Sequence, residues 1–261
     1  MGKKIVLFDK IYIIKSERTR QDIFSRYLKY LNERYKGFTS TRVKIKKLRD
    51  FDKRFAIEIF GPDEVFVMNI IKKEVGTITE LKDVRIGQEY KGTMVDVGKF
   101  GFGIFVDCAI LDPKIDVLLN LFTLRKQLCN DKEKSTRDII KAYDFIDHYP
   151  IHLKIVKIDL ENKKIQGEIA ERTLKMYKKI IDENIEGIFA CGTTKSQFKK
   201  ALINTGHLRD IISLERFSFL EHIVLLKEDT NAPGIISNIG RYLKNCKLSA
   251  LRPQKIKDIF C

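Results

Sequence analysis

The sequence predicts an α+β protein with three consecutive domains, namely a small β-α-β-β-α domain, a five-stranded barrel and a β-α-β-β-α-β domain. Short apolar runs separated by turn residues predict the strands, and longer runs at helical spacing predict the helices. A length of 261 residues also exceeds that of one average domain. We place the domains at residues 1–80, 84–172 and 173–261.

The first domain begins with a β-rich segment at residues 4–14. Ser16 then offers an N-cap, residues 17–35 carry one apolar stripe at helical spacing, and Gly37 is suited to end that helix. A strand over residues 54–60 and a helix from Asp63 to Val75, closed by Gly76, complete the domain.

Residues 42–46 alternate strictly between basic and apolar side chains. With a period of two, Val43 and Ile45 point inward, while Arg42, Lys44 and Lys46 form a basic row on the other face. Such a row suits contact with RNA phosphates, and it equally suits an edge strand that lysines protect from pairing with another chain.

Five strands are predicted in the second domain, over residues 87–97, 102–108, 115–120, 150–158 and 164–170. A turn rich in glycine joins the first two. A polar, helix-leaning insertion at about 121–147 separates the third from the fourth. Five strands with a helical piece in this place match the order of the OB fold.

The third domain alternates helices and strands. Its elements are a helix at 172–183, a strand at 186–191, a helix at 194–205 capped by Thr193 or Thr194, a hairpin at 210–227, a helix from Asn231 and a strand at 246–251. After the opening helix, this is the ferredoxin-like order β-α-β-β-α-β.

Four segments of the second domain resemble the S1 family of RNA-binding OB folds. Gly92–Val95, Phe102–Asp107, Asp116–Asn120 and Ile155–Ile165 follow, in order, the family pattern G-x-V, F-G-A-F-V, G-L-V-H-x-S and V-x-x-I-D with the strand after it. In that family, RNA lies across one face of the barrel and stacks on two aromatic rings.

The resemblance implies that Phe102 and Phe105 are the stacking residues. Three positions apart in a regular strand, they would face opposite ways, so we expect a bulge at Gly103 to bring both onto one face. The turn is longer than in the family, which leaves open whether Phe100 or Phe102 stacks. Without the resemblance, filling of the barrel interior explains Phe105 equally well.

The same resemblance implies polar and basic contacts on neighbouring strands. The family histidine falls at Leu119 or Asn120, so that contact is absent or replaced, and Asp159 and Lys164 resemble its polar and basic pair. The predicted RNA contacts are Lys99, Phe100, Phe102, Phe105, Asn120, Asp159, Lys164, Arg42, Lys44 and Lys46.

The whole chain, with its Thr205-Gly206-His207 and Asn231-Ala232-Pro233-Gly234 segments, is similar to an archaeal protein family of unknown function. More loosely, the domain order resembles RNA-exosome cap subunits, the stalk subunit of archaeal RNA polymerase and an initiation-factor subunit. That likeness implies RNA as a partner, together with the ribosome, the exosome or RNA polymerase.

The net charge of +15 favours a polyanionic partner, and it is unevenly distributed. Residues 1–50 carry +10, whereas the second domain, with 15 basic and 14 acidic side chains, carries only +1. The strongest electrostatic attraction for phosphate therefore need not come from the barrel.

We expect no catalysis, cofactor or metal site. His207 with Asp210, and Glu221 with His222, are candidate acid–base pairs, but no recognisable nucleophile accompanies them. The five cysteines lack zinc-site spacing, and we expect them to be reduced and mostly buried. With no apolar run long enough to span a membrane and no signal peptide, we expect a cytoplasmic protein.

The sequence therefore predicts a non-catalytic RNA-binding protein of archaeal translation, transcription or RNA processing. Two alternatives stay open. The barrel, being close to neutral, also suits an accessory factor that docks on the ribosome, exosome or RNA polymerase. The third domain also allows an RNA-modifying enzyme.

Overall fold

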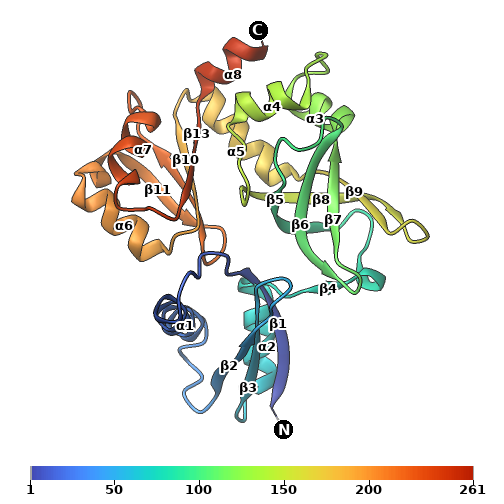
Figure 1. The fold of residues 1–261 in the computed structure, drawn as a ribbon, viewed down its shortest axis with the longest axis vertical. Coiled ribbons are helices and arrows are strands. Elements are labelled where there is room, and N and C mark those ends of the chain that lie inside the picture. The colour runs from blue at the N-terminus through green and yellow to red at the C-terminus, as the bar shows by residue number, and fades with distance from the viewer. Residues whose placement is uncertain (1, 261) are drawn as a thin grey trace. The chain divides into compact units, whose positions relative to one another are not determined.

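The computed structural model describes residues 2–260 and divides into two compact units (Figure 1). The first unit comprises the residues up to 78 together with 218–220, and the second comprises residues 79–217 and 221–261. The α+β class predicted from the sequence is confirmed.

The first unit has the predicted β-α-β-β-α order. Its elements are β1 (Lys3–Lys10), α1 (Glu17–Asn32), β2 (Arg42–Leu48), β3 (Arg54–Phe60) and α2 (Glu64–Glu74). The strands form an antiparallel sheet in the order β1-β3-β2. Ser16 caps α1 as predicted, but the helix ends at Asn32, where the Tyr35 hydroxyl donates a hydrogen bond to the Asn32 side chain at 2.6 Å.

The core of the first unit lies between one face of the sheet and both helices. Ile57 and Ile59 of β3 face Tyr27 of α1 and Ile71 of α2 within one buried cluster. The segment 218–220 contributes Phe219, whose ring centroid lies 4.8 Å from that of Tyr27.

The second unit contains a closed five-stranded barrel, and the predicted OB order is confirmed. Its strands are β5 (Glu89–Val95), β6 (Gly103–Leu111), β7 (Ile115–Asn120), β8 (Pro150–Asp159) and β9 (Lys164–Ile169). They pair in the order β6-β5-β8-β9-β7, and β7 pairs with β6 to close the ring. A two-residue strand that the sequence did not predict, β4 (Thr79–Glu80), joins β6 in parallel.

Two helices make up the predicted insertion between β7 and β8, α3 (Leu121–Leu128) and α4 (Thr136–Tyr143). Asn120 caps the first helix, and Ser135 forms a capping box with Asp138 at the second. A short 3-10 turn, η1 (Leu81–Asp83), precedes the barrel.

The remainder of the second unit is a four-stranded antiparallel sheet with helices. Its elements are α5 (Glu171–Asp182), β10 (Gly187–Cys191), α6 (Lys195–Asn204), η2 (His207–Asp210), β11 (Ile211–Arg216), β12 (Glu221–Leu226), α7 (Ala232–Gly240), β13 (Lys247–Leu251) and α8 (Pro253–Phe260). The order β11-β12-β10-β13 confirms the ferredoxin-like prediction. Thr194 caps its helix as expected, Asn231 is the N-cap of the helix that was predicted to start there, and α8 was not predicted.

The barrel and the four-stranded sheet share one hydrophobic core. Tyr149 of the barrel stacks on Phe189 of β10 with a centroid distance of 4.3 Å. The amide of Ala250 in β13 donates to the Asp144 carboxylate at 2.8 Å. The division of this region at residues 172 and 173 stays a prediction.

Cys108, Cys129 and Cys191 are buried and Cys246 is half-buried, all four as free thiols, while Cys261 lies outside the described residues. Across residues 2–260, every helix is too short or too polar to serve as a membrane span.

Candidate nucleic-acid interface

Three phenylalanine rings gather on the outer surface of the barrel, at the start of β6. The ring centroids of Phe100 and Phe102 are 5.4 Å apart, those of Phe100 and Phe105 are 5.3 Å apart, and those of Phe102 and Phe105 are 6.1 Å apart. Phe102 is 54% exposed. Ile104 and Val106, on either side of Phe105, point into the core, so Phe105 points outward.

Gly103 shapes the backbone that brings these rings together. Its φ is +158°, and an added Cβ atom would lie 2.3 Å from the carbonyl oxygen of Leu119. The expected bulge is absent at this point, because Gly103 and Phe105 pair with Asn120 and Leu118 without a register shift. The rings meet because the chain turns at the glycine, where β6 begins.

A groove of about 660 Å³ runs beside the ring cluster. Its floor follows a row of outward positions that the strand register aligns across four strands. Val95 pairs with Phe105, Phe105 with Leu118, and Leu118 with Gln166. The groove thus combines apolar and aromatic surface with one amide, a surface on which a flat base can lie.

The charged groups of the groove are mixed in sign. Lys114, Lys163 and Lys164 line it together with Asp96 and Asp116. Lys99 reaches over the Phe100 ring at 5.5 Å and forms an ion pair with Asp96 at 3.5 Å. Of the predicted contacts, Lys99, Lys164 and the three phenylalanines therefore lie in or beside one site.

Two further predicted contacts have their polar atoms engaged by neighbours. The Asn120 side chain accepts from the amide of Thr123 at 2.8 Å and donates to Gln166 at 3.4 Å. Asp159 accepts from the amide and the side chain of Asn162, both at 2.9 Å, and these bonds lower the pKa of its carboxyl. Asn120 borders the groove through Gln166, whereas Asp159 stabilises the turn before β9.

The predicted basic row lies on β2 of the first unit. Arg42, Lys44 and Lys46 are all exposed. The ammonium groups of Lys44 and Lys46 lie 5.6 and 5.8 Å from the ring centroid of Phe60, and Lys46 forms an ion pair with Glu58.

Sequence reasoning missed Lys114, Lys163, Leu118 and Gln166 as groove residues. Lys163 directly precedes a predicted contact, which was a usable local signal. Leu118 and Gln166 join the site only because β7 pairs with β9, and no local pattern reports that pairing.

The histidines that raised the question of catalysis occupy two different environments. His207 Nδ1 lies 2.8 Å from Asp210, as the spacing suggested, and its Nε2 lies 2.9 Å from the Asn238 amide nitrogen. His222 is fully buried, 3.0 Å from the carbonyl of Thr193, and burial lowers its pKa to about 3. Within residues 2–260, no three acidic, histidine or cysteine side chains group as metal ligands do.

Two family models match the second unit. Residues 84–181 match the DUF2110 central domain, and residues 186–251 match the DUF2110 C-terminal domain. No curated protein gives a significant match to this chain.

Several solved structures are similar over part of the chain. The uncharacterized protein MJ1198 from Methanocaldococcus jannaschii is 16% identical with a TM-score of 0.24, and the alignment covers 34% of this chain and 96% of that one. GSP13 from Bacillus subtilis is 17% identical with a TM-score of 0.24, covering 34% and 58%.

A chain of the a/eIF2alpha–aDim2p–rRNA complex from Pyrococcus horikoshii is 11% identical with a TM-score of 0.26, covering 47% of this chain and 64% of that one. This chain thus spans less than two thirds of the length of that protein and of GSP13. TM-scores at this level support no conclusion about function, and the barrel assignment follows from the strand order alone.

Proposed function

The chain belongs to the DUF2110 family, and from that premise we propose that it is a non-catalytic RNA-binding protein acting in the cytoplasm, in archaeal translation, transcription or RNA processing. The observation that carries the proposal is the outward display of Phe100, Phe102 and Phe105 beside a groove with lysines on its rim. Exposed rings next to ammonium groups are suited to bases and phosphates together.

The groove favours single strands over duplexes. A base can stack on a ring only when its own face is free, and each such contact contributes about 1–3 kcal/mol. Stacking reads no base edges, and the groove offers few polar groups beyond Gln166 and the side chains of its rim. We therefore expect little sequence preference.

The test is fluorescence polarisation of the full chain with a labelled single-stranded RNA, comparing wild type with Phe102→Ala. Loss of one stacking ring should weaken binding by about 1–3 kcal/mol, roughly 5- to 150-fold. Phe66→Ala is the matched control, because Phe66 is 63% exposed on α2 of the other unit. Equal affinities for the Phe102 variant and wild type would reject the stacking mechanism.

A protein-docking role is the second candidate. It is favoured by Phe122 of α3, which is 75% exposed and offers an apolar surface that a protein partner could bury. The partner would be a subunit of the ribosome, exosome or RNA polymerase. Capture of such a subunit that survives nuclease treatment supports docking, and capture that nuclease abolishes supports RNA binding.

An RNA-modifying enzyme is the remaining alternative. It would be supported if RNA incubated with the protein were recovered with a chemically changed base.

A further inference from the structure

The sheet of the first unit has two chemically different faces. Ile57 and Ile59 belong to the face that both helices cover. On the outer face, the register aligns Lys4 of β1, Glu58 of β3 and Lys44 of β2 in one row across the sheet. Both lysines are exposed.

A β-bulge adds a further lysine to the outer face. Ile45 pairs with Ile57, but the next paired residue of β2 is Lys47, opposite Ala56. Lys46 is the extra residue, and its contacts with Glu58 and the Phe60 ring place it on the same face as Lys47. A regular strand would direct one of two successive lysines inward, so the bulge is what brings both to the surface.

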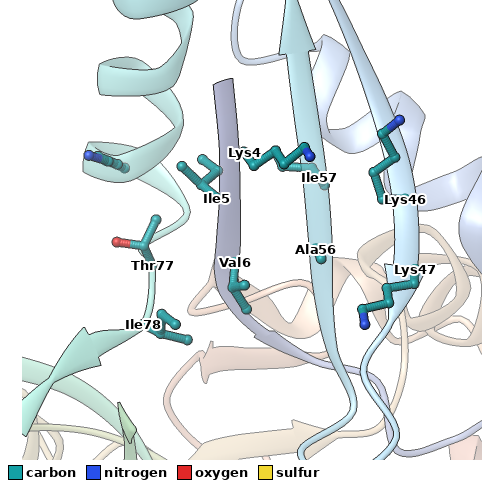
Figure 2. A pocket seen from close by; sticks show the side chains of 10 residues that line it. Lys4, Ile5, Val6, Lys46, Lys47, Ala56, Ile57, Thr77 and Ile78 are labelled. Carbon is teal, nitrogen blue, oxygen red and sulfur yellow. The ribbon is translucent and has the colours of Figure 1, made fainter. Parts of the chain in front are cut away.

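Lys4, Lys46 and Lys47 line a hollow of about 650 Å³ (Figure 2). Lys4 extends from β1 across β3, and Lys47 extends from β2 toward β3. Val6 and Ala56 give the hollow an apolar floor, and Lys72 of α2 also lines it.

The outer face carries a strong positive charge. The register places Arg42 opposite Phe60, so Arg42 joins Lys4, Lys44, Lys46 and Lys47 there. Among the described residues of β1, β2 and β3, Glu58 is the carboxylate that the register puts on this face, and its side chain is only 6% exposed. Residues 1–78 as a whole hold 19 basic and 10 acidic side chains, a net charge of +9.

Protection of a sheet edge accounts for basic side chains on β2, an edge strand in the order β1-β3-β2, but not for Lys72 of α2. The free side of β1 is already occupied, because the amide of Phe8 donates to the carbonyl of Gly76 at 3.0 Å and that of Ile78 donates to Val6 at 3.2 Å. Lys4 therefore lies on a strand whose free side is covered from Val6 to Phe8.

We propose that the outer sheet face is a second RNA site, which binds the sugar-phosphate backbone without regard to base sequence. This inference rests on the proposed RNA-binding function and adds Lys4, Lys47 and Lys72 to its phosphate contacts. Each phosphate that a lysine neutralises releases condensed counterions, so binding here is strongly salt-dependent, whereas stacking in the barrel groove is not.

The experiment measures RNA affinity of the full chain against salt, between about 50 and about 200 mM. Lys4→Gln/Lys47→Gln should make the slope of log K against log salt shallower by about 1.4, or about 0.7 for each lost phosphate contact to a single strand. Lys199→Gln/Lys200→Gln, which removes the same charge from exposed positions on α6, is the matched control and should change the slope little. Lys4→Arg/Lys47→Arg should keep the wild-type slope, which separates loss of charge from loss of folding.

Equal slopes for the two glutamine double variants would overturn the second site. Phe102→Ala, measured in parallel, should weaken binding at every salt concentration with an unchanged slope. If the lysine variant changes the slope and the phenylalanine variant binds as wild type does, the barrel proposal fails and the sheet site stands. Binding of the chain to phosphatidylserine vesicles but not to RNA would reject both.

Discussion

The aromatic groove of the barrel and the lysine-rich outer face of the first sheet differ in the means by which we propose that they bind RNA. The groove lies in a region with 15 basic and 14 acidic side chains and depends on the placement of three rings. The sheet face depends on a net charge of +9 in its unit and on flexible side chains. The comparison teaches that the domain with the recognisable RNA-binding motif need not supply the electrostatic attraction.

This difference sets what each region tolerates. Rings must keep their positions to stack on a base, so the groove is sensitive to backbone geometry. Lysine side chains can contact phosphates in a range of geometries, so RNA affinity at the sheet face should depend on charge and salt concentration instead.

The largest expected effect is that of Gly103→Ala on the groove. An added methyl group meets the Leu119 carbonyl at 2.3 Å and the φ is unfavourable for alanine, so we expect a loss of about 3 kcal/mol in the free energy of unfolding. Gly101→Ala is the control, because an added Cβ there meets nothing within 4 Å. Urea unfolding measures the stability of both variants. Equal free energies of unfolding would show that the fold beside the groove does not require glycine at position 103.

Low pH should destabilise the second unit and leave the stability of the first unit nearly unchanged. All four histidines lie between residues 148 and 222, and none lies in residues 1–78. Burial lowers the pKa of His222 to about 3; burial, with Arg172 and Lys91 nearby, lowers that of His152 to about 4. Both folded pKa values lie below the unfolded value of about 6.5, so the unfolded chain binds protons at these histidines before the folded chain does. The free energy of unfolding is therefore unaffected by them above about pH 6.5 and decreases as the pH falls from there toward 4.

At pH 5, each of these two histidines should lower the free energy of unfolding by about 2 kcal/mol relative to pH 7. Hydrogen exchange, corrected for its intrinsic pH dependence, should show the loss in the second unit and spare amides of the first. His222→Gln should reduce the pH dependence while keeping a donor for the Thr193 carbonyl. Equal protection at both pH values throughout the chain would contradict this assignment.

A smaller effect distinguishes stacking from simple apolar contact. Phe105→Leu keeps an apolar side chain in the groove and removes its flat ring, so RNA affinity should fall by about 1 kcal/mol, roughly fivefold. Phe60→Leu makes the same change beneath Lys44 and Lys46 and should leave affinity nearly unchanged. If polarisation shows equal losses, the two regions do not differ in the way proposed.

The smallest expected effect concerns the carboxylate of the sheet face. Glu58→Gln removes the negative charge beside Lys46, so affinity for RNA should rise by about 0.5 kcal/mol at low salt. Glu74→Gln, which breaks the ion pair of Arg34 at 3.1 Å, is the control. A fall in affinity would mean that Glu58 holds Lys46 in its binding position.

Local features of the fold were predictable from the sequence. The strands at 54–60 and 115–120 begin and end at the predicted residues, and Ser16 and Thr194 cap their helices as predicted. These signals arise from neighbouring residues, so a linear pattern contains them.

Features that depend on pairing between distant segments were not predictable. The alternation of residues 42–46 gives no sign that the register shifts between Ile45 and Lys47. The row from Phe105 to Gln166 likewise exists only because three strands pair in one register. The family resemblance pointed to the rings, and the strand register completed the groove around them.

The stack of Tyr149 on Phe189 has a practical consequence for anyone who trims this chain. A stop codon or protease cut between α5 and β10 would leave Tyr149 without the ring that covers it and would expose apolar surface to water. A barrel excised at that boundary is therefore expected to aggregate during expression. Transplanting it into another protein requires a substitute for the lost aromatic lid.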